Sequence, residues 1–178
     1  MARTKKAGDG VGKPAPSTLP TDQQRILAHE KALRLLGVRE RSASELRQRL
    51  RQKGFDRDVI EGVLERLRET GLQDDSRFAE HYASEATTTR GFASRRVRGE
   101  LMRKGISRDL AAVASTTDPD QEEERARALA VQRAARMGSL GAEARARRIL
   151  SLLARRGYDA DICRRIAAEV ASFEREAP

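Results

Sequence analysis

The chain has 178 residues, one cysteine, no tryptophan and a formal net charge of +9, with 35% of its residues charged. A single cysteine excludes an internal disulfide, and no apolar stretch has the length of a signal peptide or a membrane span, so we expect a cytoplasmic protein. Four Phe and two Tyr are the only aromatic residues. This leaves little material for a surface that stacks unpaired bases, and phosphate contact is the polyanion chemistry that the composition supports.

Residues 1–20 read as a disordered basic arm. They hold four cations, three prolines and three glycines, and almost nothing apolar. That composition cannot bury enough surface to order a chain segment. Two interpretations stay open for this arm: a solubilising tail, or a segment that touches DNA.

After the arm, one local pattern occurs three times, and each copy is centred on a glycine. The glycines are Gly54, Gly105 and Gly157. They lie 51 and 52 residues apart, and each follows a Lys or Arg and precedes an apolar residue. This is typical of a helix that ends at a left-handed glycine. The residues placed to open the next helix as its N-cap are Asp56, Ser107 and Asp159.

The helix before each glycine carries apolar residues four and eight positions upstream, on one face. These pairs are Leu46 and Leu50, Val97 and Leu101, and Ile149 and Leu153. A further helix is expected before each pair of helices. The first spans about 22–36 and stops at Gly37. Its large apolar residues are available for burial, namely Ile26, Leu27, Leu33 and Leu36. The other two helices begin at Asp74 or Asp75 and at Asp118.

The sequence therefore predicts an all-α protein of nine helices. They form three tandem three-helix repeats, over residues 21–71, 72–118 and 119–178, in an elongated, curved array. The lone Cys163 falls beside apolar positions of the last helix, which favours a buried structural residue.

Charge is sorted by helix. The three helices that run into the glycines carry fourteen basic and three acidic residues, whereas those that follow carry seven basic and twelve acidic ones. The basic helices therefore predict a surface for a polyanion or an acidic partner. The candidate contact residues are Arg47, Arg49, Arg51, Lys53, Arg95, Arg96, Arg98, Arg103, Lys104, Arg145, Arg147, Arg148, Arg155 and Arg156.

Other kinds of site find less support. A helix-turn-helix reader would place its second helix against DNA, but here that helix is acidic in every repeat. His29-Glu30 has no second histidine four residues on, so the zinc-protease spacing is absent, and acidic residues gather where helix N-termini favour negative charge. We expect no catalytic residue, metal or cofactor.

Three segments carry a resemblance to a known family. They are ALRLLGVRERSASELRQRLRQKGF at 32–55, GLQDDSRFAEHY at 71–82 and GELMRKGISRDL at 99–110. Together they resemble the RecX family of bacterial recombination regulators, with a match over residues 25–175 that is tighter up to Leu110 than in the third repeat. The family usually has Leu-Asp-Asp before Ser-Arg-Phe, whereas Gln73 stands at the first of those positions here. That departure lies at a helix entry and does not alter the expected fold.

The resemblance implies a modulator, mainly an inhibitor, of the RecA recombinase that acts in recombination, DNA repair and the SOS response. RecX-like proteins bind along the RecA–DNA filament and restrain ATP hydrolysis, strand exchange and filament growth. The implied partners are that filament and single- and double-stranded DNA, without a membrane, and the chain is expected to be a monomer. The alternative is a general DNA-binding protein of helical repeats without a recombinase partner. Which face meets protein and which meets DNA stays open at this point.

Overall fold

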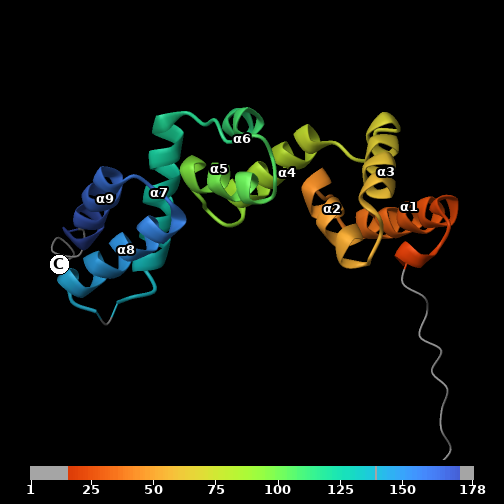
Figure 1. Ribbon diagram of the computed structural model, residues 1–178. Helices are drawn as coiled ribbons and strands as arrows, with labels where there is room; N and C mark the ends of the chain where they lie inside the picture. Colours follow the sequence, from red (N-terminus) through yellow and green to blue (C-terminus); the bar gives the residue numbers. More distant parts are fainter. Residues whose placement is uncertain (1–15, 139, 173–178) are drawn as a thin grey trace, which may run out of the picture. The chain divides into compact units, whose positions relative to one another are not determined.

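The computed structural model describes residues 16–138 and 140–172 (Figure 1). Within these ranges it contains nine α-helices, one short 3-10 helix at Pro16–Thr18 and no strand, which confirms the predicted all-α class. Most of the basic arm lies outside the described residues. The helices are α1 (Thr21–Val38), α2 (Ala43–Gln52), α3 (Arg57–Glu69), α4 (Asp75–Thr88), α5 (Ser94–Arg103), α6 (Arg108–Ala114), α7 (Pro119–Ala134), α8 (Ala142–Arg156) and α9 (Ala160–Ser172).

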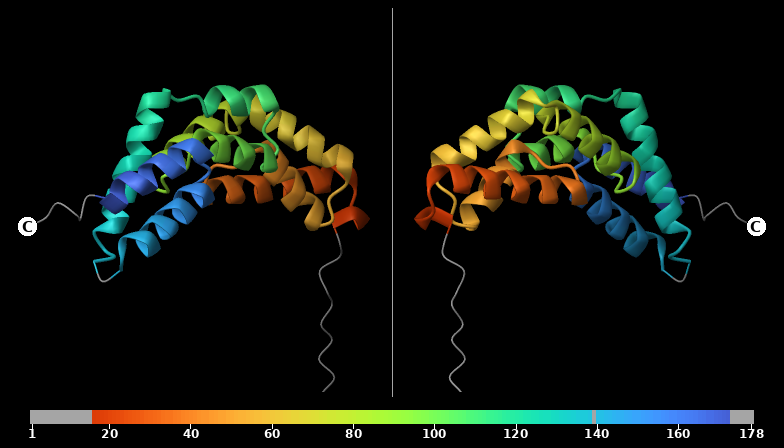
Figure 2. Two further views of the ribbon diagram at one scale, coloured as in Figure 1. Left: turned by 90° about the vertical axis from the view of Figure 1, so that its left-hand side faces the viewer. Right: turned by 90° about the vertical axis from the view of Figure 1, so that its right-hand side faces the viewer.

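The helices group into two compact units, of which the first ends at Gln73 and the second begins at Asp74. The first unit holds α1–α3 around one hydrophobic core. The second holds two cores, one among α4–α6 and one among α7–α9, whose helices lie together in both views of Figure 2. The boundaries of the three repeats and the elongated outline stay predictions.

The core of the first unit corrects the prediction for three of the four apolar residues of α1, whereas the fourth, Leu36, packs half-buried against that core. Ile26, Leu27 and Leu33 are 62%, 42% and 38% exposed, whereas Ala28 and Ala32 are fully buried. The small side chains of these alanines let the backbone of α1 come close to α2 and α3, so the helix packs through its alanine face. The helix also continues through Gly37 to Val38 instead of stopping there.

A buried glutamine ties α1 to the start of α3. Gln24 is 2% exposed, and its Nε2 donates to Asp56 Oδ2 at 2.8 Å and to the Leu19 carbonyl at 3.1 Å. Its Oε1 accepts the backbone N–H of Asp56 at 3.2 Å. Asp56 stands at the predicted N-cap, but no cap hydrogen bond to its side chain forms. The carboxylate of Asp56 instead accepts the hydrogen bond from Gln24.

The three glycine turns share one hydrogen-bonding pattern. Gly54, Gly105 and Gly157 have φ values of 84°, 83° and 91°, in the left-handed region that favours glycine. The N–H of each glycine donates to the carbonyl three residues before it. The next residue is buried, and its N–H donates to the carbonyl five residues before it. Each turn is therefore a Schellman motif, in which the apolar residue after the glycine covers the helix end.

The helix entries agree with the sequence in most places. The side chains of Ser42, Asp74, Ser107 and Asp118 accept backbone N–H groups at the starts of α2, α4, α6 and α7. The predicted core pairs before the glycines are all at most 1% exposed, and Cys163 is 2% exposed. The helix α7 begins directly after its cap Asp118, as predicted, and ends at Ala134.

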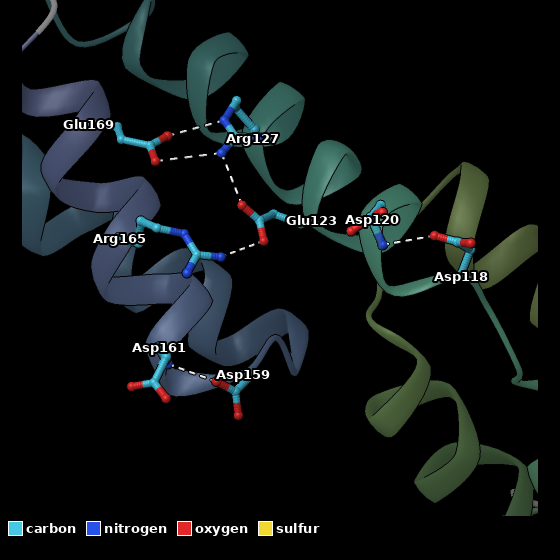
Figure 3. A network of polar contacts seen from close by, with 8 residues as sticks. All are labelled: Asp118, Asp120, Glu123, Arg127, Asp159, Asp161, Arg165 and Glu169. Carbon is cyan, nitrogen blue, oxygen red and sulfur yellow. Dashed lines mark hydrogen bonds and ion pairs between the residues drawn. The ribbon is translucent and has the colours of Figure 1, made fainter.

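A network of ion pairs joins α7 to α9 (Figure 3). Arg127 donates to Glu123 at 3.0 Å on its own helix and to Glu169 of α9 at 3.1 Å, and Arg165 of α9 donates to the other oxygen of Glu123. From the sequence, acidic residues near the start of a helix such as α7 are expected only to favour the helix dipole. In the folded protein it links two helices of the third repeat.

Candidate nucleic-acid interface

In the first unit, the predicted cations of α2 are exposed to different degrees. Arg49, Arg51 and Lys53 are exposed, and the structure gives Arg51 and Lys53 no ion pair among the residues that it describes. Arg47 instead forms a bidentate contact with Glu61 of α3, with N–O distances of 2.6 and 2.8 Å. This hydrogen-bonded guanidinium lowers the pKa of the Glu61 carboxyl.

A groove of about 600 Å³ lies between α2 and α3. Its walls carry three arginines, Arg47, Arg51 and Arg57, together with Phe55, Ile60 and Glu61. Arg57 belongs to α3, whose net charge is negative. Counting charges helix by helix therefore does not show that Arg57 lines the same groove as Arg51.

The cations of α5 divide between solvent and packing. Arg95, Arg98 and Arg103 are exposed, although Arg98 Nε lies 3.4 Å from Ser115 Oγ and Arg103 lies 3.6 Å from Glu100. Arg96 donates to Glu100 at 3.1 Å and to the carbonyl of Arg155. Lys104 is half-buried, with its Nζ 5.0 Å from the centre of the Tyr82 ring.

The cations of α8 divide in the same way. Arg147, Arg148 and Arg155 are exposed, and Arg147 pairs with Glu143 at 3.3 Å. Arg145 is only 2% exposed and donates to the Leu140 carbonyl at 2.8 Å, so it supports the loop before α8 instead of a contact surface. Arg156 is half-buried beside Gly91 and Phe92.

Within the second unit, the end of α8 docks onto the connection between α4 and α5. The N–H of Ala93 donates to the Arg156 carbonyl at 3.0 Å, and Tyr158 Oη donates to the Gly91 carbonyl at 3.2 Å. A carboxylate oxygen of Glu122 accepts the backbone N–H of Ser94 at 3.0 Å, at the start of α5. Polar backbone groups of the second repeat are thus satisfied by the third.

Around this junction lies a cluster of cations and aromatic rings that sequence analysis missed. Phe92 lies under Arg96, whose Cζ is 3.9 Å from the ring centre, and Arg90 and Arg156 are 6.0 and 5.5 Å away. Arg90 also lies 5.3 Å from the ring centre of Tyr82. The run Arg90-Gly91-Phe92 before a basic helix was the one available signal, and it does not reveal that α8 supplies the third guanidinium.

The same cluster contains the phenol of Tyr82, whose pKa is raised by its surroundings. Burial, reinforced by a hydrogen bond to Glu100 and the charge of that carboxylate, raises the pKa of Tyr82 to about 12. Burial also pushes the pKa of Glu100 upward, but the hydrogen bonds from Tyr82 and Arg96 outweigh it, so the net direction is downward. Glu100 therefore stays charged at neutral pH and holds the surrounding cations in place.

Neither metal nor membrane chemistry emerges from the part of the chain that the structure describes. Within residues 16–138 and 140–172 no three His, Cys, Asp or Glu side chains gather in a way that could hold a metal ion. No helix in those ranges combines the length and the apolar character needed to cross a membrane.

Comparison with known proteins assigns the family. The model for the first three-helix domain of RecX matches residues 28–67, and that for the second matches residues 74–114. Regulatory protein RecX of Amycolatopsis mediterranei is 39% identical over 144 residues, which cover 80% of this chain and 82% of the relative. The chain belongs to the RecX family. RecX of Thermobifida fusca is 37% identical over 168 residues, covering 92% of this chain and 89% of the relative.

Solved RecX structures share the fold. The crystal structure of RecX from Lactobacillus salivarius superposes with a TM-score of 0.69 at 24% identity and covers 84% of this chain and 97% of its own. A second RecX crystal structure has a TM-score of 0.72 at 22% identity and covers 93% of this chain and 81% of its own. The predicted family and the helical-repeat class are both confirmed.

Proposed function

We propose that this RecX-family protein modulates a RecA recombinase by binding along the RecA–DNA filament. Its family membership over most of the chain carries the proposal. Bound to the filament, it would restrain ATP hydrolysis, strand exchange and filament growth. The restraint is mechanical and stoichiometric, so no residue needs to perform chemistry.

The exposed cations support a phosphate-binding contribution. Arg51 on α2, Lys53 just after α2, Arg95 on α5, and Arg148 and Arg155 on α8 are exposed and are given no ion pair among the described residues. Such side chains can neutralise DNA phosphates and release counterions, which strengthens binding most at low salt. By contrast, Arg96, Arg145 and Arg156 serve packing and are not proposed as primary contacts.

Tandem repeats suit a polymeric partner. Each repeat offers a few weak contacts, and a filament presents identical subunits at regular spacing. Once one repeat is bound, the others reach neighbouring sites at a high effective concentration, so avidity for the polymer exceeds the affinity for one subunit. Preference for the assembled filament over free recombinase follows without any single strong site.

The test compares three targets at one fixed salt concentration: filament assembled on DNA with ATP, the same DNA alone, and free RecA. We expect the tightest binding to the filament and a fall in DNA-dependent ATPase activity as the protein is titrated. Equal affinity for filament and bare DNA, with the ATPase activity unchanged at saturation, would identify a general DNA-binding protein instead.

A matched pair of variants locates the contact. Replacing Arg148 and Arg155 by Gln removes two exposed cations, whereas replacing Glu65 and Glu69 by Gln removes two exposed carboxylates from the acidic helix α3. We expect the first variant to weaken binding to duplex DNA. The slope of log K against log[salt] for this binding should become shallower by up to about 1.8, at about 0.9 for each phosphate that the protein no longer neutralises. The second should not weaken DNA binding; the reverse result would exchange the roles assigned to the two kinds of helix.

A further inference from the structure

In the first unit, α3 packs against both α1 and α2, and a groove lies on each side of it (Figure 1). The groove between α2 and α3 carries the three arginines and the single carboxylate described above. The groove on the other side, between α1 and α3, has a volume of about 550 Å³ and a mainly apolar surface. We call it the α1–α3 groove. Its uncharged lining residues are Ile26, His29, Gly62 and Val63.

The wall that α1 contributes to this groove exposes large apolar side chains. Ile26 is 62% exposed, and Leu33, which lies seven residues further on and therefore on the same face of the helix, is 38% exposed. Four of the nine large apolar side chains that are exposed in the described part of the chain lie on α1. Apolar residues scattered singly over a surface are ordinary, whereas such a concentration on one helix is typical of a contact site.

The wall that α3 contributes is lowered by Gly62. This glycine lies in the middle of α3, is exposed, and does not have a left-handed φ. A Cβ added to it would meet no described atom within 4 Å beyond the backbone of its own helix. Alanine would therefore fit at this position and would favour the helix more than glycine does. Packing within the first unit gives no reason for glycine here, and its effect is to leave room in the groove.

Apart from His29, the charged side chains that line the α1–α3 groove have partners of opposite charge. Three ion pairs, each within one helix and with N–O distances of 3.4, 3.5 and 2.8 Å, join Arg25 to Asp22, Arg66 to Glu69 and Arg34 to Glu30. These three cations and three carboxylates add no net charge to the groove. A groove without surplus positive charge does not complement a phosphate, whereas an uncharged apolar side chain matches both its charge and its walls.

We propose that the α1–α3 groove binds a large apolar side chain on the protein surface of the recombinase. This inference rests on the proposed function and names a surface of the first unit that meets protein. Duplex DNA carries charged phosphates along its outside, which suit the arginines of the groove between α2 and α3. An apolar groove of this size is the kind of site in which one buried side chain anchors a protein interface. The two sides of α3 thus fit different parts of a protein–DNA filament.

The first test changes the chemistry of the groove. Ile26→Gln makes its exposed wall polar, and Val38→Gln is the matched control, because Val38 is 79% exposed on the same helix but does not line the groove. Binding to RecA filament assembled on DNA with ATP, and to the same DNA alone, is measured at one salt concentration. Circular dichroism checks that both variants are folded.

We expect Ile26→Gln to bind the filament about tenfold more weakly than the wild type, as the loss of an anchoring contact at an interface does. Its binding to bare DNA should be unchanged, because the groove meets protein. Val38→Gln should match the wild type on both targets. Equal weakening of filament binding by the two variants would mean that no particular apolar residue of α1 matters, and unchanged filament binding by Ile26→Gln would mean that the groove is not used. Either result overturns the proposal.

The second test changes the shape of the groove. Gly62→Leu places a side chain where the wall of α3 is low, and leucine favours a helix more than glycine does. We therefore expect this variant to unfold at a higher urea concentration than the wild type and yet to bind the filament more weakly. Loss of fold cannot produce that combination. Filament binding as tight as that of the wild type, or tighter, would contradict the proposal.

Two other occupants of the groove give different results. If Ile26→Gln weakens binding to bare DNA as much as binding to the filament, the groove contacts DNA. If the wild type dimerises in sedimentation experiments and Ile26→Gln abolishes the dimer, the groove is filled by a second copy of this chain. Each of these results overturns the assignment to the recombinase.

The wild-type protein provides a measurement that does not depend on variants. Oxidation of Ile26 by hydroxyl radicals, followed by mass spectrometry, should fall when the filament is added, whereas oxidation of Val38 should persist. Unchanged oxidation of Ile26 at saturating filament would contradict the proposal even if a variant failed to fold. A wild type that shows no preference for the filament over bare DNA would instead contradict the proposed function, so the two failures are distinguishable.

Discussion

Glycine is needed at position 157 for two reasons, a left-handed backbone and a close approach to α5, whereas at Gly54 only the first reason applies. Both adopt a left-handed conformation that an L side chain opposes. A Cβ on Gly54 would meet only Pro16 Cδ at 3.6 Å, which is ordinary contact. A Cβ on Gly157 would lie 2.5 Å from Arg96 Cβ and 3.3 Å from the Arg96 backbone nitrogen. The third glycine turn is thus also the point where α8 meets α5.

We therefore expect Gly157→Ala to destabilise the protein more than Gly54→Ala. The conformational cost is about 1 kcal/mol in each case. The clash with the backbone of α5 adds about 1–3 kcal/mol at Gly157 alone, as overpacking does elsewhere. Urea denaturation followed by circular dichroism measures both changes, and equal destabilisation would show that the close approach to Arg96 relaxes without cost.

At the scale of elements, the ion pairs between α7 and α9 make the third repeat sensitive to acid. Arg165 and Arg127 hydrogen-bond to Glu123 and lower the pKa of its carboxyl. A carboxyl with a lowered pKa in the folded state contributes stability above its unfolded-state pKa of about 4.3, and this contribution is lost as the pH falls through the folded value.

The variant Glu123→Gln tests this contribution. It should be less stable than the wild type at neutral pH, and the difference between the two proteins should shrink as the pH falls below about 4.3. Glu124→Gln is the control, because Glu124 is exposed and has no ion pair among the described residues. Urea midpoints measured across this range decide the matter. A pH-independent difference between wild type and Glu123→Gln would contradict the ion-pair account.

At the scale of the whole molecule, the two compact units provide separate cores. Gln24 lies in the first, where it satisfies the N–H of Asp56 from a buried position. Gly157 lies in the second, where it permits α8 to approach α5. A change at either residue therefore acts on a different set of buried side chains.

Hydrogen exchange of single variants tests whether the units open separately. Gln24→Leu leaves Asp56 without its partner, which costs about 1–3 kcal/mol, and should speed exchange within residues 21–70 but not within 74–172. Gly157→Ala should do the opposite. The control Gln23→Leu changes an exposed neighbour and should have little effect. Faster exchange across both units from one change would show that they unfold as one.

The sequence by itself determined the features that depend on local spacing. The glycine turns, the apolar pairs of the helices that precede them and most N-caps follow from residues within a few positions of one another, because helix geometry and capping are local. The nine helices among residues 16–138 and 140–172 could be recognised for the same reason, and the family from three short segments of sequence. The buried position of Cys163 also followed from its apolar neighbours along the last helix.

Only the tertiary structure decided which side chains these helices bury and which cations they leave exposed. The helix α1 packs through Ala28 and Ala32, because close approach to α2 and α3 favours small side chains over Leu33. Arg145 turned inward to a loop carbonyl, and Arg96 and Arg156 joined Phe92 at a junction built from residues about 60 positions apart. Such arrangements depend on how helices and loops meet in three dimensions, within one repeat for α1 and Arg145 and between two repeats for Phe92, and no spacing along the chain encodes that geometry.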